Sequence, residues 1–321
     1  MSSKSSIKNL LHLSIPIFFA NLAIPLVAIV DTGLMGNLDD ASYLTATSIA
    51  SSLFSMIFFS FGFLRMGTVG MVAQAHGSNQ YNEIVDLVFR NITFVIVISL
   101  LLIFLQHFIF NLGLQIFDLS NDTEKYFKDY FYIRIYSSFG ELTIFVITGL
   151  FIGLQKTKIS SVVVGFFSVT NIIFSLFFVL YFKLNVTGVA LGTLVSSTLT
   201  SFIFLIYTFF ELKKLTNINF DIKKIFNVKK IQNIFNINFN IFVRSVLLTF
   251  SFLFFTYLGN TISEDVVAAN TILINLIFLS AFILDAYAFS TEGIVGYSIG
   301  SKNITLLRNV IKNSFMLSAS T

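Results

Sequence analysis

Apolar residues recur along this chain in long runs, without the alternating or one-faced patterns of soluble domains. The runs predict eight complete membrane spans, at about 13–36, 44–75, 87–112, 126–153, 159–182, 187–211, 236–259 and 266–300, and a ninth that begins near residue 304. Each run can cross a hydrocarbon core, which is about 30 Å thick. Barrel strands are far shorter, so only helices satisfy the backbone at these lengths. The chain is therefore predicted to be an all-α polytopic membrane protein.

Composition supports a membrane protein and excludes several chemistries. Hydrophobic residues make up 55% of the chain and charged residues 11%, and mean hydropathy is +0.86. Soluble domains are usually about 25% charged. The absence of cysteine excludes disulfides and thiolate nucleophiles, the three histidines are scattered, and no phosphate-binding GxxxxGK[ST] loop occurs. With none of these motifs, we expect no enzyme activity, no metal and no cofactor. We also expect no nucleic-acid partner, because the net charge of +4 reflects where the lysines lie relative to the membrane.

Lysine and arginine positions predict the orientation of the chain. Fourteen of them fall on the side that holds the N-terminus, against three on the other side. The positive-inside rule then places the N-terminus in the cytoplasm. Six of the fourteen lie in segment 212–235, the one linker that the sequence shows. We interpret these lysines as positive charge that keeps the segment on the cytoplasmic side, in preference to a specific lipid-binding site.

The sequence repeats itself at an offset of 223 residues. Gly36, Gly70 and Gly77 match Gly259, Gly293 and Gly300, and Asn37 and Ser78 match Asn260 and Ser301. Chance matches of Ile or Leu are common in such a composition, but matched glycine, asparagine and serine at one offset are not. Six spans separate the copies, so both have the same orientation. Parallel repeats are typical of transporters with two lobes that alternate access.

The repeat divides the chain into two units. Residues 1–223 form a predicted lobe of six spans, and residues 224–321 hold the seventh and eighth spans and the start of a ninth. A second six-span lobe would end about 125 residues beyond Thr321. We therefore expect the chain to be a partial sequence whose second lobe is open on one side.

The first span contains both prolines of the chain, Pro16 and Pro25, and an aspartate, Asp31. In a helix Pro25 cannot donate to the carbonyl of Asn21, so each proline frees an acceptor and permits a bend. A freed carbonyl and a carboxylate both survive in a membrane where they line a wet cavity. This predicts that Asp31 exchanges a proton or binds a cation, and that its charge alters the bend at Pro25. The alternative is a static kink with Asp31 salt-bridged.

Other polar residues in the spans carry weaker signals. Asp285 and Glu292 share one face of the eighth span, where they form a second protonatable site or pair with Arg65 or Arg244. Glu141 and Arg134 share a face of the fourth span and are expected to bridge each other. Asn171 either bonds across helices or lines the cavity.

The stretches "PLVAIVDTGLMGNL", "FGFLRMGTVGMVAQAHG", "GLFIGLQKTKIS", "VALGTLVSS" and "VVAANTILINLIFLSAFILDAYAFSTEGIVGYSIG" resemble the multidrug and toxic compound extrusion (MATE) family, in its DinF-like branch. The resemblance runs from about residue 10 to the end of the chain. It implies a twelve-helix exporter of two six-helix lobes that is driven by a proton or sodium gradient.

The resemblance also assigns residues. Asp31 matches the acidic residue of the bent first helix, and Asn171 and Thr193 match polar positions of the same cavity. Four residues form the corresponding polar cluster of the second lobe: Arg244, Asn270, Asp285 and Glu292. In the fifth span Ser168 and Ser175 replace an asparagine and an aspartate of the family pattern. Asp31 is thus the lone acid of the first lobe's pattern, which weakens the case for a two-carboxylate sodium site.

The function expected from these features is a secondary antiporter that exports amphipathic or cationic organic compounds in exchange for H⁺ or Na⁺. It would act by alternating access with protonation-linked bending of the first helix, as a monomer in the bacterial inner membrane. The alternatives are a flippase for a lipid-linked precursor and a non-transporting fragment. A flippase favours a cavity lined by several basic residues, whereas the three arginines within the spans, Arg65, Arg134 and Arg244, are matched by acids.

Overall fold

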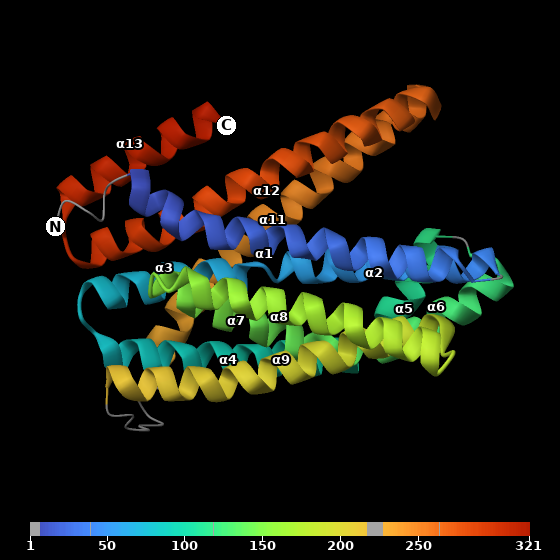
Figure 1. The fold of residues 1–321 in the computed structure, drawn as a ribbon, viewed down its shortest axis with the longest axis horizontal. Coiled ribbons are helices and arrows are strands. Elements are labelled where there is room, and N and C mark those ends of the chain that lie inside the picture. The colour runs from blue at the N-terminus through green and yellow to red at the C-terminus, as the bar shows by residue number, and fades with distance from the viewer. Residues whose placement is uncertain (1–6, 39, 118, 217–226, 263) are drawn as a thin grey trace.

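The computed structural model describes residues 7–38, 40–117, 119–216, 227–262 and 264–321, and within these ranges it is helical with no strand. The elements are α1 (Ile7–Gly36), α2 (Ala41–Ser60), α3 (Phe63–Gly77), α4 (Tyr81–Phe104), α5 (Gln106–Phe117), α6 (Asn121–Arg134), the 3₁₀ turn η1 (Ile135–Ser137), α7 (Ser138–Gly153), α8 (Thr157–Leu176), the π-helical turn η2 (Phe177–Tyr181), α9 (Asn185–Leu215), α11 (Val228–Ile262), α12 (Glu264–Gly300) and α13 (Ile304–Ser320). They lie roughly along one direction as an elongated bundle (Figure 1).

Seven helical segments among the described residues are long and apolar enough to cross a membrane. They coincide with the first seven predicted spans. The predicted eighth span coincides with α12, and α13 begins at the residue predicted for the ninth. The total of eight spans and a ninth is therefore not established by length and hydropathy. Residues 217–226 of linker 212–235 lie outside the described residues.

Several predicted spans are broken helices. The second span bends between α2 and α3 at Phe61 and Gly62, and the third bends between α4 and α5 at Leu105. At the first break, the amide of Gly62 bonds the carbonyl of Phe59 instead of continuing the α-helical ladder. Hydropathy averaged over a whole span does not detect such breaks, because the few polar residues beside them lie within long apolar runs.

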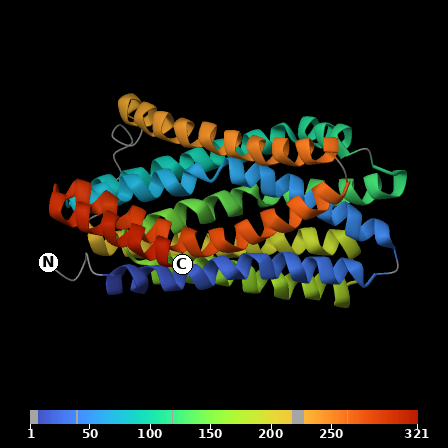
Figure 2. The same cartoon turned by 90° about the horizontal axis from the view of Figure 1, so that it is seen from above.

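Helix α1 continues through both prolines. It packs mainly against α8 and α12. Helix α1 therefore belongs to the first bundle, α1–α9, and also contacts the α11–α12 hairpin. Figure 1 shows this hairpin diverging from α1 and α2 toward its tip, and Figure 2 shows it from above, lying over the bundle. At the opposite end α12 returns to α1, α3 and α13.

Helices α3 and α12 end in the same local geometry. Asn79 and Lys302, which are 223 residues apart, have positive φ values of 59° and 54°. After each helix the amide of the next residue reaches back five positions in the chain: Gln80 bonds the Ala75 carbonyl and Asn303 bonds the Ser298 carbonyl. This hydrogen bond belongs to the pattern that closes a helix at a residue with left-handed backbone conformation. The repeat found in the sequence therefore recurs in the backbone.

The same two helices meet through glycines. A Cβ atom at Gly77 would collide with the Tyr297 carbonyl and lie 2.9 Å from the Ser301 nitrogen. A Cβ atom at Gly300 would collide with the Gln74 carbonyl. Tyr297 occupies the repeat position of Gln74, so each glycine contacts the equivalent carbonyl of the other copy. Small residues permit such close approach of helices in a membrane.

Candidate functional site

Asp31 lies five residues before the end of α1, where it faces α6 and α8. Its Oδ1 atom is enclosed by protein and has no hydrogen-bond partner. The carboxylate contacts the Ser175 hydroxyl and interacts electrostatically with Arg134 and Tyr130. A buried carboxylate oxygen without a partner is costly, so the site is suited to take up a proton or a cation.

A chain of side chains leads from Asp31 into the bundle. The Ser175 hydroxyl is 3.4 Å from Asn171 Oδ1, and Asn171 Nδ2 donates to Thr193 Oγ1 at 3.0 Å. Thr193 in turn donates to the Val189 carbonyl at 3.2 Å. Helices α8 and α9 pack closely here because residue 192 is glycine. A Cβ atom at this position would lie 2.6 Å from the Ser175 hydroxyl oxygen. The structure thus brings together Asp31, Asn171 and Thr193, as the resemblance implies.

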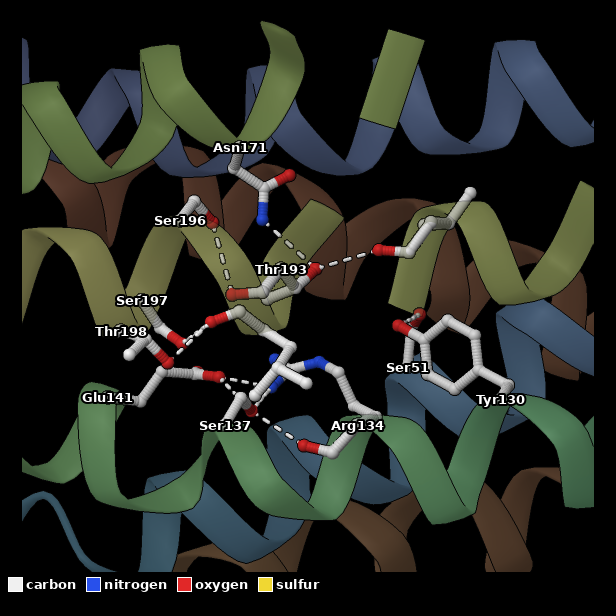
Figure 3. A network of polar contacts seen from close by, with 12 residues as sticks. Ser51, Tyr130, Arg134, Ser137, Glu141, Asn171, Thr193, Ser196, Ser197 and Thr198 are labelled. Atoms are coloured by element: carbon white, nitrogen blue, oxygen red, sulfur yellow. Dashed lines mark hydrogen bonds and ion pairs between the residues drawn. The ribbon is translucent and has the colours of Figure 1, made fainter. Parts of the chain in front are cut away.

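Arg134 and Glu141 form a buried ion pair at the junction of α6, η1 and α7. Figure 3 shows the guanidinium directed at Glu141 and at the Ser137 hydroxyl, which itself donates to Glu141 at 2.9 Å. The guanidinium also lies over the Phe54 and Phe58 rings, 5.2 and 5.3 Å from their centroids. The pair that the sequence predicted on one face of this span is confirmed.

Removing one member of this pair should destabilise the protein strongly. Glu141→Leu leaves a buried guanidinium without its partner, and we expect a loss of about 3–5 kcal/mol of unfolding free energy. The double variant Arg134→Leu/Glu141→Leu removes both charges and should recover most of that loss. Thermal unfolding followed by helix circular dichroism in detergent measures both. Equal melting temperatures for the single and double variants would contradict the expectation.

The electrostatics of the site are simple because few charges face it. Helix α2 has no charged residue, α8 has none after Lys158, and α9 has none before Glu211. The charged groups of the site are Asp31, Arg134 and Glu141. The last two neutralise each other, so the site carries one net negative charge when Asp31 is ionised and none when it is protonated.

Tyr130 and Ser51 belong to the site and were missed from the sequence. The Ser51 and Tyr130 hydroxyls are 3.3 Å apart, between α2 and α6, and Tyr130 is buried (Figure 3). Tyr130 lies one helical turn before Arg134, so the shared face of the helix was the available signal. Ser51 carries no such signal, because serines are frequent throughout the second span.

The predicted second-lobe cluster is only partly brought together. Asp285 and Glu292 of α12 interact electrostatically with Arg65 of α3 and Arg244 of α11. Within the described part of the chain no ion pair within 4.0 Å joins these four residues. Asn270 lies fifteen residues before Asp285, about 22 Å along the helix, and so stands apart from the cluster. The described residues contain no group of three or more His, Asp or Glu that could hold a metal ion.

Comparison with known proteins places this architecture among transporters. The MatE family matches residues 16–177. The chain is 28% identical to the DNA damage-inducible protein F of Escherichia coli (strain K12) over 306 residues, 95% of this chain and 66% of that protein. It is 23% identical to the multidrug export protein MepA of Staphylococcus saprophyticus, over 76% of this chain and 54% of MepA. The chain therefore spans less than two thirds of the length of these relatives.

A solved structure shows the same fold. It is described as the outward-facing conformation of a multidrug resistance MATE family transporter of the MOP superfamily, and it superposes with a TM-score of 0.87 at 17% sequence identity. The match covers 97% of this chain and 69% of that chain. The helix arrangement of this chain is thus that of the matched transporter structure.

Proposed function

The chain belongs to the MatE family of membrane transporters, and from this premise we propose that it works as a secondary antiporter which exports cationic or amphipathic organic compounds in exchange for H⁺ or Na⁺. The observation that carries the proposal is Asp31, whose Oδ1 atom is buried without a partner in a site that otherwise holds one neutral ion pair. A proton and a cationic substrate each restore neutrality there, and both cannot do so at once. Competition for one charge is the minimal requirement of antiport.

The Ser175 hydroxyl offers a way to transmit the exchange. It has one proton and two neighbouring acceptors, the Asp31 carboxylate and Asn171 Oδ1. A hydroxyl donates to one acceptor at a time. It would therefore donate to ionised Asp31, and turn to Asn171 when Asp31 is protonated. In this proposal Ser175, which replaces the aspartate of the family pattern in the first lobe, changes its hydrogen bond with the protonation of Asp31.

Alternating access requires one end of the two units to close while the other opens. The glycine contacts between α3 and α12 close one end, and Lys230 of α11 pairs there with Glu83 of α4. The hairpin diverges from α1 and α2 at the other end (Figure 1). If the protein lies in a bacterial inner membrane with its N-terminus on the cytoplasmic side, the closed end is the cytoplasmic end and this arrangement is outward-facing. One proton that enters down 100 mV and half a pH unit supplies about 3 kcal/mol, which supports about a hundredfold gradient of a neutral substrate.

Pro25 is predicted to permit the bend of α1. Pro25→Ala restores a donor to the Asn21 carbonyl and adds an α-helical hydrogen bond, so the helix becomes harder to bend. We expect slower gradient-driven transport with unchanged membrane insertion. Pro16→Ala is the matched control, because Pro16 lies on the same helix fifteen residues before Asp31. Unchanged transport in Pro25→Ala would exclude the bending mechanism.

The function is tested in proteoliposomes that contain the purified protein. A fluorescent organic cation is loaded on one side, and either a pH gradient or a sodium gradient of equal size is imposed. We expect substrate movement that one gradient drives and that dissipating this gradient abolishes. A susceptibility panel in an efflux-deficient host then identifies the substrates. If neither gradient moves any compound that the host panel identifies, the antiporter proposal is wrong.

A further inference from the structure

A small cavity lies between the first bundle and the α11–α12 hairpin, away from Asp31. It is bordered by α1, α3, α7, α8 and α12, and the centres of water-sized molecules can occupy about 20 Å³ in it. That is room for one or two waters or a small ion. Its polar lining consists of Asn21, Arg65, Thr148, Ser160 and Ser161.

Arg65 stands out because its charge has no direct partner. Its Nε atom is enclosed and makes no hydrogen bond, and no carboxylate of the described residues lies within 4.0 Å of the guanidinium. The guanidinium stacks on the Phe289 ring, 4.0 Å from its centroid. Stacking uses the face of the guanidinium and leaves the in-plane Nε–H without a protein acceptor. Enclosed charged groups are normally hydrogen-bonded and paired, so the unpartnered Nε–H of half-buried Arg65 is an open donor for a ligand.

Other lining groups offer donors to the same space. The Ser161 hydroxyl is enclosed and has no partner, and Ser160 and Asn21 are buried. The Thr148 hydroxyl is already used, because it donates to the Ile144 carbonyl at 2.8 Å. Arg65 can only donate, and the hydroxyl and amide groups can donate as well. The cavity therefore presents an enclosed guanidinium N–H and several potential O–H and N–H donors.

We propose that the Arg65 cavity binds a small monovalent anion, with chloride as the physiological ligand. Arg65 Nε–H and the Ser161 hydroxyl would donate to it, and Asn21 and Ser160 would complete its shell. Water would satisfy the hydrogen bonds but would place no negative charge within ion-pair distance of Arg65. Asp285 and Glu292 attract Arg65 only from beyond ion-pair distance, and they share this attraction with Arg244.

The site also joins the two units. Arg65 and Asn21 come from α3 and α1, and Phe289 comes from α12. Ile17, Val69, Ile152, Ala286 and Phe289 form a buried apolar cluster in the same region. Separation of α12 from α3 would open the cavity. Bound anion would therefore stabilise the arrangement in which the two helices are in contact.

The test uses the purified protein in detergent and does not depend on transport. Thermal unfolding is followed by circular dichroism at one ionic strength, in sodium chloride mixed with sodium gluconate. We expect a saturable rise of a few degrees in melting temperature with chloride, and excess broadening of the ³⁵Cl magnetic resonance line. Arg65→Gln should abolish both effects and Ser161→Ala should reduce them. Thr170→Ala, whose hydroxyl donates to the Phe166 carbonyl on α8, is the matched control and should keep both.

Each outcome decides the proposal. Chloride effects that Arg65→Gln removes and Thr170→Ala retains support the site. The absence of any chloride effect in the unmodified protein would mean that water alone fills the cavity, which overturns it. Equal effects in Arg65→Gln would place the anion elsewhere, which also overturns it. If Arg65→Gln fails to fold, Ser161→Ala against Thr170→Ala makes the same comparison.

Discussion

Asp31→Asn is expected to abolish gradient-driven transport. The amide keeps the size and much of the hydrogen bonding of the carboxylate, but it neither binds nor releases a proton and carries no charge for a cation. Asp31 is the one titratable acid of its site that is not held in an ion pair, since Glu141 is bonded to Arg134. No described group of the site can therefore take over its role. The measurement is the initial rate of substrate movement in proteoliposomes under an imposed gradient.

The matched control for this variant is Asp40→Asn. Asp40 caps α2 by accepting a bond from the Ser42 amide at 2.8 Å, and asparagine caps helices equally well. This control should transport at the unmodified rate and insert to the same level. Unmodified rates in Asp31→Asn as well would show that coupling occurs elsewhere, with the α12 carboxylates as the next residues to examine.

Gly77→Ala and Gly300→Ala are expected to hold the closed end apart. In each variant the new Cβ atom overlaps a backbone carbonyl of the facing helix, which no rotamer change can relieve. Overpacking of this kind costs about 1–3 kcal/mol. That energy shifts the balance of two conformations about fivefold to 150-fold, so the state with this end closed should become rare and transport should slow by a similar factor.

Gly70→Ala is the control for this pair, because a Cβ atom at Gly70 meets nothing within 4 Å although it lies on the same helix. The chain contains no cysteine, so a single cysteine introduced at Ser298 of α12, which is 1% exposed, reports opening of the closed end without background labelling. Faster labelling in Gly77→Ala than in Gly70→Ala is the expected result. Equal labelling and equal transport would show that the contact is not a gate.

The sequence was sufficient for properties that depend on neighbours along the chain. Hydropathy placed the first seven spans, because the thickness of the bilayer alone sets the length of an apolar run. The pairing of Arg134 with Glu141 followed from helical spacing, which puts residues seven apart on one face. The repeat at 223 residues anticipated that Gly77 and Gly300 occupy equivalent places. The odd chemistry of Asp31 and Pro25 was visible because charge and proline are rare in such runs.

The tertiary structure decided which distant residues meet. The proximity of Ser175 to Asp31, and of Tyr130 to both Ser51 and Asp31, depends on how α1, α2, α6 and α8 pack, which no local pattern encodes. The isolation of Arg65 is likewise a property of packing: the sequence supplies acids for it, and only the geometry shows that none lies within ion-pair distance among the described residues. Membrane helices are similarly apolar on every lipid-facing side, so their mutual rotation is set by small residues and buried polar groups.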